Sequence, residues 1–187
     1  MGPSGSGKTT LLNAVTGLIR PTAGSIHILG TRIDALSRSR RAAFRNAHIG
    51  LISQSADLLP ELSTLENVIL AQLFNGGPKQ QIRDHGMECL ERVGLSHKAE
   101  ANPRTLSGGE AQRVAVARAL SRSDLALIVA DEPTASLDMT NAEVVARLLI
   151  QAGRTNEVGV LLATHDPRIA DMCSRIHSLA RTQQHIA

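Results

Sequence analysis

Short apolar runs separated by longer amphipathic segments organise this chain. Leu125–Ala130 and Val158–Ala163 are apolar at nearly every position, and Ile49–Gln54 is a compact apolar run with Gln54 at its end. A strand with one face in water alternates apolar and polar residues, so these runs predict buried strands of a parallel sheet covered on both faces. Shorter strands are predicted at Ser25–Leu29 and Ile176–Leu179.

Helical periodicity fills most of the segments between these runs. Apolar residues recur at helical spacing over Thr10–Leu18, and the same reasoning predicts helices at about 37–47, 65–74, 80–93 and 110–120. Ser107 with Glu110, and Thr140 with Glu143, have the spacing of a helix-capping box. Strands that alternate with helices predict an α/β fold, and the helices between about residues 56 and 122 predict a helical subdomain inserted into it.

Bulk composition narrows the class of protein. A chain of 187 residues with 42% hydrophobic and 20% charged residues predicts one globular domain. Cys89 and Cys173 lie far apart without metal-binding neighbours, which indicates reduced structural thiols. The net charge is +3, but the chain has no Trp or Tyr and only two Phe, so a base-stacking platform is hard to build and no nucleic-acid partner is expected. The clearest basic cluster, Arg38 to Arg45, is equally well explained as a solvated helix face.

The first nine residues fit the pattern Gly, four residues, Gly, Lys, Ser/Thr, which is a phosphate-binding P-loop. Its glycines permit positive φ and let phosphate oxygens approach the backbone, and the following helix contributes N–H dipoles. Lys8 is expected on the β- and γ-phosphates, and the Thr9 hydroxyl on Mg²⁺. The competing interpretation is a Gly/Ser-rich linker, which the helical pattern after Thr10 makes weaker.

Two further positions follow strand ends, where open α/β sheets bind ligands. Asp131 and Glu132 follow the run that ends at Ala130, so Asp131 suits Mg²⁺ and Glu132 can polarise an attacking water. Without a P-loop the pair would be read as a surface turn. His165 follows the strand that ends at Ala163 and can hydrogen-bond a γ-phosphate, although a lone histidine usually has no such role.

The start of the helix at 110–120 carries two adjacent glycines. Gly108 and Gly109 each cost about 1 kcal/mol of helix propensity. A capping box alone does not need them, but a phosphate that approaches the helix N-terminus closely does.

The whole chain resembles the ATP-binding cassette (ABC) ATPases. The resemblance rests on Gly2–Thr9, on Gln54, on the run from Leu106 to Leu120, on Leu127–Glu132, on Ser136–Asp138 and on His165. The run from Leu106 is the most specific of these, because other P-loop families lack it. Residues 58–68 look most like the macrolide-export and lipoprotein-releasing branch of the family.

The resemblance implies a role for each motif. Catalytic roles fall to Glu132 as the base, to His165 as the switch histidine and to Gln54 of the Q-loop. Metal ligands would be Thr9, Gln54 and Asp131, and Asp138 belongs to the D-loop. The nucleotide would be bound by the Walker A loop and, from the other subunit, by the signature motif; these residues are Gly2, Pro3, Ser4, Gly5, Ser6, Gly7, Lys8, Thr9, Thr10, Ser107, Gly108, Gly109 and Glu110.

The implied function is that of the ATP-hydrolysing subunit of a membrane transporter, with ATP and Mg²⁺ as cofactors. The implied fold is a single nucleotide-binding domain over residues 1–187, a P-loop NTPase with a mostly parallel sheet flanked by helices. The implied partners are a second ATPase subunit in a head-to-tail dimer and an integral membrane permease, which holds the protein at the inner face of the cell membrane.

The family places antiparallel strands, an adenine-stacking aromatic residue and the P-loop strand before Walker A, whereas here only Met1 precedes Gly2. A core without these strands is therefore expected, with Ser25–Leu29 as an exposed edge. The alternative hypothesis is a truncated, catalytically impaired chain that acts as a binding or regulatory module or does not fold stably.

Overall fold

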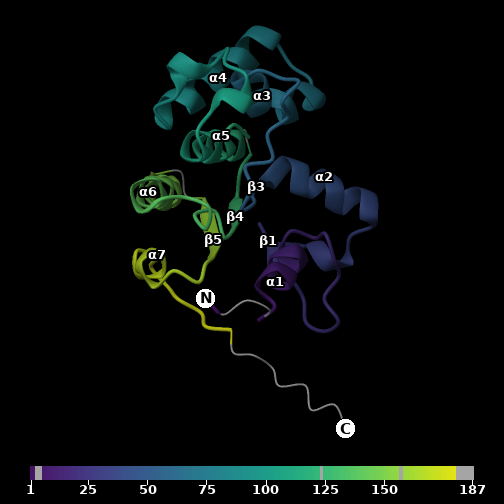
Figure 1. Cartoon of the computed structure of the whole chain (residues 1–187). Coiled ribbons are helices and arrows are strands. Elements are labelled where there is room, and N and C mark those ends of the chain that lie inside the picture. The colour runs from purple at the N-terminus through teal and green to yellow at the C-terminus, as the bar shows by residue number, and fades with distance from the viewer. Residues whose placement is uncertain (3–5, 123, 156–157, 180–187) are drawn as a thin grey trace.

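A parallel sheet of three strands forms the centre of the computed structural model, which describes residues 1–2, 6–122, 124–155 and 158–179. The strands are β3 (Ile49–Ile52), β4 (Leu127–Asp131) and β5 (Gly159–Ala163), in the order β3-β4-β5 (Figure 1). Ile49 is opposite Leu127, and Leu127 is opposite Gly159. The prediction of three parallel strands is confirmed, but only β3 and β4 are mostly buried, because β5 is largely half-buried and only Ala163 of it is buried.

Helices cover both faces of this sheet. On one face, Leu12 of α1 (Lys8–Val15) packs against Ile49 and Val129. On the other face, α5 (Gly108–Leu120) and α6 (Met139–Thr155) pack against Ile128 and Ala130 in the main core. The short helix α7 (Pro167–Asp171) follows β5, and α2 (Arg38–His48) precedes β3. The fold class is therefore the predicted α/β arrangement.

Two helices form a layer of their own within residues 56–122, the range of the predicted helical subdomain. They are α3 (Thr64–Asn75) and α4 (Lys79–Arg92), which pack against each other and against α5 (Figure 1). Short 3₁₀ turns at Ser96–Lys98 and Pro103–Thr105 lead back to α5. Ser63 and Glu66 cap α3 with a complete capping box, and Asn67 fixes the preceding loop by bonds to Leu59.

Several local predictions need correction. The predicted strand Ser25–Leu29 is a small hairpin of β1 (His27–Ile28) and β2 (Thr31–Arg32), because Leu29 and Gly30 both have positive φ and turn the chain back on itself. Among the described residues the two strands pair only with each other, so the outer edge of this hairpin stays unpaired, as expected. The first helix ends at Val15, so that Leu18 lies beyond it and is exposed.

Two other predictions are wrong. Thr140 lies inside α6, and the residue that accepts a bond from the first turn is Asp138, from the Asn141 N–H at 2.9 Å. Ile176–Leu179 forms no strand, although its backbone bonds to Met1. An isolated segment needs a neighbour to become a strand.

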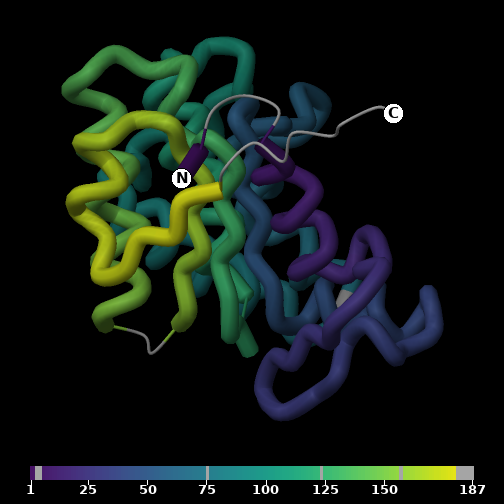
Figure 2. The backbone as a smooth tube through the Cα atoms, turned by 90° about the horizontal axis from the view of Figure 1, so that it is seen from below, coloured from purple at the N-terminus to yellow at the C-terminus, as the bar shows by residue number. Residues whose placement is uncertain are grey.

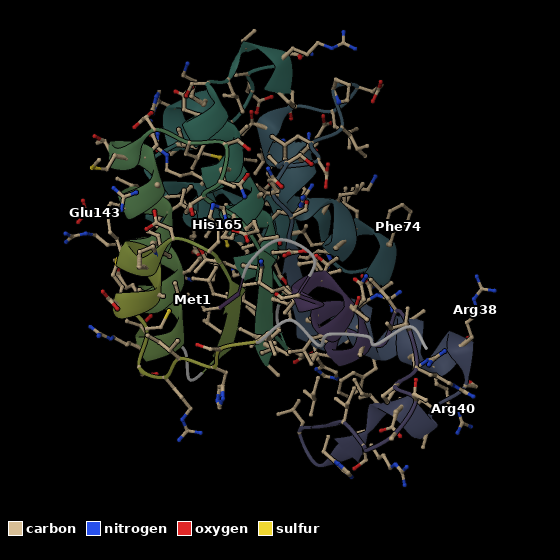
Figure 3. The ribbon with its side chains drawn as sticks, turned by 60° about the horizontal axis from the view of Figure 1, so that its bottom comes forward. Met1, Arg38, Arg40, Phe74, Glu143 and His165 are labelled. Atoms are coloured by element: carbon tan, nitrogen blue, oxygen red, sulfur yellow. The ribbon has the colours of Figure 1, made fainter. Side chains whose placement is uncertain are left out.

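The basic cluster on α2 is a solvent-facing surface in part. Arg38 and Arg40 are exposed and point away from the molecule (Figure 3), while Arg41 and Arg45 are half-buried against the loop after α1. Ser37, the first residue of the predicted helix, is its N-cap, so the helix itself begins at Arg38. Within the described residues, no helix is long and apolar enough to span a membrane.

Both cysteines are free thiols. Cys89 is buried in the α3–α4 layer, and burial raises the pKa of its thiol to about 11. Burial also raises the pKa of the Cys173 thiol, which is less completely covered. High thiol pKa values disfavour the reactive thiolate, which fits the prediction of structural cysteines.

Gly86 allows α3 and α4 to approach each other, and its replacement tests this packing. An added Cβ would lie 2.2 Å from Ile69 Cγ2 and 2.8 Å from Leu65 Cδ1. Gly86→Ala should therefore lower the free energy of unfolding by about 1–3 kcal/mol in urea titrations, because overpacking outweighs the gain in helix propensity. Gln81→Ala, at an exposed position of the same helix, is the matched control and should leave stability within about 0.5 kcal/mol. A stabilised Gly86→Ala protein would contradict this account.

Candidate active site

The carboxyl ends of the three parallel strands define one edge of the sheet, and the predicted catalytic residues lie there. Asp131 ends β4 and Glu132 follows it, His165 lies two residues after β5, and Gln54 lies two residues after β3. The N-terminus of α1 meets the same edge and brings Lys8 and Thr9 to it. Topology alone thus gathers residues that are more than 100 positions apart.

Glu132 is the centre of this cluster. Its Oε1 lies 3.3 Å from Lys8 Nζ, and its Oε2 lies 2.9 Å from His165 Nδ1. The side chains of Lys8 and Glu132 are only 9% and 15% exposed, so water screens their attraction little. The His165 side chain is 64% exposed, so it is the solvent-facing member of the cluster.

The backbone of Glu132 is strained. Its φ is 48°, a left-handed conformation that costs a non-glycine residue of order 1–3 kcal/mol. The Glu132 N–H donates to the Ala163 carbonyl at 2.9 Å, which holds the residue in this turn beside β5. The strain aims the carboxylate back at α1 instead of continuing the line of β4.

Asp131 binds α1 directly and keeps one oxygen free. Thr9 Oγ1 donates to Asp131 Oδ2 at 2.7 Å, while Asp131 Oδ1 is buried and has no hydrogen-bond partner. A buried carboxylate oxygen without a partner is costly, and a hard cation would satisfy it. Among the described residues, no three His, Cys, Asp or Glu side chains gather around a metal. A hydroxyl with one carboxylate is the sparse protein ligand set that Mg²⁺ uses with phosphate and water.

The described part of the P-loop is closely packed. Gly7 has φ 87° and is the N-cap of α1, and the Gly2 carbonyl accepts a 2.6 Å hydrogen bond from Lys8 Nζ. A Cβ on Gly2 would lie 2.6 Å from Ser6 Oγ and 2.8 Å from the Leu179 carbonyl oxygen, so glycine is required there. Ser6 Oγ is itself buried without a partner. The predicted ligands Pro3, Ser4 and Gly5 lie outside the described residues.

The predicted signature residues lie at the start of α5, apart from the Glu132 cluster. The capping box is complete: Glu110 N–H donates to Ser107 Oγ at 3.2 Å, and Ser107 N–H donates to Glu110 Oε2 at 2.8 Å. The Ser107 N–H, with Lys98 at 3.7 Å, lowers the pKa of the Glu110 carboxyl. Ser107 and Glu110 thus bond each other and Lys98, and not the Glu132 cluster.

The two glycines of this motif differ. A Cβ on Gly109 would lie 2.4 Å from Asn141 Oδ1 and 2.5 Å from Asn141 Cγ, so close packing of α6 against α5 explains Gly109. A Cβ on Gly108 would meet only Leu137 Cδ2, at an ordinary 3.8 Å. Internal packing therefore does not explain Gly108, and an external ligand remains the interpretation for that residue alone.

The sequence did not predict how the Q-loop is held. Gln112 on α5 is 2% exposed and donates to the Ser53 carbonyl at 2.9 Å. Arg118, one and a half turns later, donates to the Ala56 carbonyl at 2.7 Å and to the Asp57 carbonyl at 2.8 Å. A polar residue among the apolar positions of α5 was the available signal. Gln54 itself is exposed, so its predicted metal and catalytic roles stay predictions.

Hydrogen bonds also fix the end of this loop. Ser53 and Ser55 hydroxyls both donate to the Asp57 carboxylate and lower its pKa. Asp57 has φ 47°, so these bonds hold a strained turn directly after Gln54.

Similarity to known proteins agrees with this geometry. A family model described as ABC transporter matches residues 1–135. The lipoprotein-releasing system ATP-binding protein LolD of Hahella chejuensis is 44% identical over 179 residues, which cover 96% of this chain and 77% of that protein. LolD of Paramagnetospirillum magneticum is 42% identical over 176 residues, covering 94% and 77%.

Two solved structures are similar over nearly the whole chain. The ATP-binding cassette MJ0796, in a dimeric post-hydrolysis state bound to ADP and Pi, has a TM-score of 0.86 and 37% identity, covering 96% of this chain and 78% of that one. CbiO1 of Clostridium perfringens, part of the cbiONQ transporter complex, has a TM-score of 0.87 and 28% identity, covering 97% and 72%.

The contrast between Gly108 and Gly109 can be tested by folding stability. Gly109→Ala should lower the unfolding free energy by about 1–3 kcal/mol, because the methyl group displaces Asn141 from its bonds to Asp138. Gly108→Ala has room and should be neutral or stabilising by about 1 kcal/mol. Urea titrations of both variants measure the difference.

A double variant gives the control for this test. Asn141→Ala removes the atoms that the new methyl group meets, so adding it to Gly109→Ala should recover part of the loss beyond the sum of the single effects. Additive effects of the two substitutions would show that the contact does not explain Gly109.

Proposed function

Because this chain belongs to the ATP-binding cassette (ABC) transporter family, as the ATP-binding and ATP-hydrolysing subunit of a membrane transporter, we propose a role for each residue of the Glu132 cluster in the ATPase cycle. Glu132 is the general base that takes a proton from the attacking water. Lys8 binds the β- and γ-phosphates, and His165 binds the γ-phosphate. The observation that carries this proposal is that Lys8 and His165 both contact the carboxylate of Glu132.

Nucleotide binding changes the partners of Glu132. In the present arrangement its two oxygens face Lys8 and His165, which are the groups assigned to the phosphates. A phosphate anion competes with the carboxylate for the same ammonium and imidazole. Binding therefore releases Glu132 to accept a hydrogen bond from water, and the nucleotide favours this state by its stronger contacts there.

Thr9 and Asp131 are the residues that would hold Mg²⁺. Their contact at 2.7 Å and the free Oδ1 of Asp131 support this assignment, and Gln54 is proposed as a third ligand. When bound, Mg²⁺ neutralises charge that develops on the phosphate oxygens. The protein's own part is to fix the Thr9 hydroxyl against Asp131, so that α1 and β4 keep the phosphates in line with Glu132.

A second copy of the chain completes the nucleotide site. The N-terminus of α5, with Gly108 uncrowded, is proposed to close on the γ-phosphate held by the partner's P-loop. The chain's family and the dimeric structure of MJ0796 support this head-to-tail arrangement. The helix N-terminus offers N–H groups and a favourable dipole to the phosphate.

A membrane permease is the other partner. We propose that it contacts the Q-loop and the α3–α4 layer, where Leu73 and Phe74 are 41% and 81% exposed (Figure 3). Similarity to LolD proteins over 94–96% of the chain favours lipoprotein release or a related export process as the transport reaction. Because α5 holds the Q-loop through Gln112 and Arg118, a permease that moves the Q-loop also moves the signature helix.

Replacement of Glu132 tests its role as the base. Glu132→Gln should lower the ATP hydrolysis rate by about 10²- to 10⁴-fold, because the amide cannot accept the proton. ATP affinity should be retained or increased, since Lys8 loses a competing carboxylate. Phosphate release and equilibrium binding of labelled ATP, both measured with the permease present, check the two effects.

Glu143→Gln is the matched control for this replacement. Glu143 is an exposed carboxylate on α6 that pairs with Arg147 and lies at the outer edge of the molecule (Figure 3). It should hydrolyse ATP at the unsubstituted rate. Equal losses in the two variants, or none in Glu132→Gln, would contradict the assignment.

Pairing driven by ATP is the second test. The Glu132→Gln protein should form a dimer in Mg-ATP and a monomer in Mg-ADP, as measured by light scattering after gel filtration. Adding Gly108→Ala should weaken the dimer about tenfold or more without lowering the melting temperature, since the methyl group fits the monomer but blocks the phosphate approach. A Gly108→Ala dimer of unchanged affinity would remove Gly108 from the proposed interface.

A further inference from the structure

A lysine outside the nucleotide-binding motifs pairs with the start of the signature helix. Lys98 Nζ lies 3.7 Å from Glu110 Oε1, and the two side chains are 33% and 21% exposed. The other oxygen of this carboxylate, Glu110 Oε2, accepts the Ser107 N–H at 2.8 Å as part of the capping box of α5. A capping box needs only the carboxylate and the serine, so it does not explain the lysine.

The backbone around Lys98 is fixed independently of its charge. Lys98 ends the 3₁₀ turn Ser96–Lys98, and its carbonyl accepts from the Ala101 N–H at 2.9 Å. The carbonyl of Ala99, the next residue, accepts from the Leu65 N–H at 2.8 Å, which ties the turn to the first turn of α3. The side chain of Lys98 can therefore lose its charge while the turn keeps its place.

Stability of the fold does not explain the ion pair either. Solvent screens a pair that is partly exposed on both sides, and such pairs contribute little to folding. The Glu110 carboxylate also keeps its hydrogen bond to the Ser107 N–H whether or not a cation lies beside it. The effect of Lys98 must then be sought in what the helix end binds.

The charge of Glu110 opposes the anion that α5 is proposed to meet. A helix N-terminus carries about half a positive unit charge, which attracts phosphate. The Glu110 carboxylate lies on the N–H of Ser107 at this same end and adds a full negative charge, so the two together are negative. The Lys98 ammonium makes the sum positive again.

Two cations face Glu110, and Lys98 has the larger effect. The pKa of the Glu110 carboxyl is lowered first by the Ser107 N–H, then by Lys98 and more weakly by Arg113. Arg113 lies on α5 itself and its Nε is buried. Lys98 comes from a different segment of the chain, so it is the cation that can be removed without disturbing α5.

The Lys98–Glu110 pair lies away from the P-loop of its own chain. Figure 1 shows the α3–α4 layer, to which the Lys98 turn is tied, at the opposite end of the molecule from α1. Figure 2, seen from below, shows the teal helices of this layer behind the other elements. The pair therefore acts on a nucleotide that a second copy of the chain brings to α5.

We propose that Lys98 is a positioning residue of the nucleotide site: it neutralises Glu110, so that the N-terminus of α5 attracts the γ-phosphate held by a second copy of the chain. Lys98 touches no nucleotide and acts through Glu110. This inference rests on the head-to-tail site proposed above and adds a residue that none of the nucleotide motifs contains.

Substitutions at the two residues change the charge of the helix end without breaking the capping box. Glu110→Gln keeps the box, because glutamine also accepts a hydrogen bond at this position. Lys98→Met removes the ammonium and keeps an unbranched apolar stem. The formal charge of the pair is then zero in the parent and in the double variant, negative in Lys98→Met and positive in Glu110→Gln.

The strength of the ATP-driven dimer tests the proposal. All four proteins carry Glu132→Gln, and the dissociation constant of the dimer in Mg-ATP is measured by light scattering after gel filtration over a range of concentrations. Lys98→Met should weaken the dimer about tenfold at each of its two nucleotide sites, and thus about a hundredfold in all. Glu110→Gln should tighten it, and the double variant should return to within about threefold of the parent.

Other roles of Lys98 predict other orders of affinity. If the ion pair only holds the structure, both single substitutions weaken the dimer and the double variant is not rescued. If Lys98 binds the phosphate directly, the double variant is as weak as Lys98→Met. Either result would overturn the proposal.

Salt separates a charge effect from a loss of packing. Raising the ionic strength from about 0.1 M to about 1 M shortens the screening length from about 10 Å to about 3 Å. The difference in dimer affinity between Lys98→Met and the parent should then shrink by about tenfold or more. A difference that is independent of salt would contradict the proposal.

Arg83→Met is the matched control for Lys98→Met. Arg83 lies on α4, is 48% exposed and pairs with Glu100, so its replacement removes one positive charge from the same layer without touching the capping box. Its dimer should stay within about threefold of the parent, and the melting temperatures of both variants without nucleotide should stay within about 3 °C of the parent. An equal loss of affinity in Arg83→Met would show that overall charge is responsible and would overturn the role of Lys98.

The same measurement distinguishes the two proposals. If the parent forms no dimer in Mg-ATP, the head-to-tail site is wrong and the role of Lys98 falls with it. If the parent forms a dimer but the four proteins do not follow the order of their charges, only the role of Lys98 is wrong.

Discussion

The contact of Glu132 with Lys8 and His165 joins three separate parts of the chain at one point. The ion pair is largely covered, and a covered pair costs nearly as much desolvation as its attraction returns. The ion pair therefore fixes the position of Lys8 and Glu132 more than it stabilises the fold. A site held by a pair of such small net worth can exchange one partner for a phosphate at little cost, which suits an enzyme that must bind and release nucleotide repeatedly.

The register of the parallel sheet makes this contact possible. Each strand pairs residue for residue with the next, so the ends of β3, β4 and β5 are level and the segments that follow them share one edge. Ile128 and Val129 of β4 are buried in the core. Their packing fixes Asp131 and Glu132, which come next in the chain, within hydrogen-bond distance of α1. Formation of the sheet therefore also assembles the site, because the proposed catalytic residues come directly after core strands.

Local pattern was enough to predict the three strands, most helices and the residues of the cluster, since each depends on neighbours in sequence. It was not enough where a distant contact decides. Gly109 is required by Asn141, 32 positions away in the chain. The tether of the Q-loop by Gln112 and Arg118 likewise depends on how α5 lies across β3. The hairpin at Leu29 and Gly30 shows a further limit, because leucine seldom adopts the positive φ that it has there.

The left-handed backbone of Glu132 lowers the stability of the fold, whereas its carboxylate is needed for the proposed reaction. Glycine or asparagine would relax that turn, so laboratory evolution toward heat resistance alone should discard the glutamate early. A screen for thermal tolerance alone would therefore select stable variants of this protein that no longer hydrolyse ATP. A joint screen for turnover and heat resistance would be needed to keep the carboxylate in place.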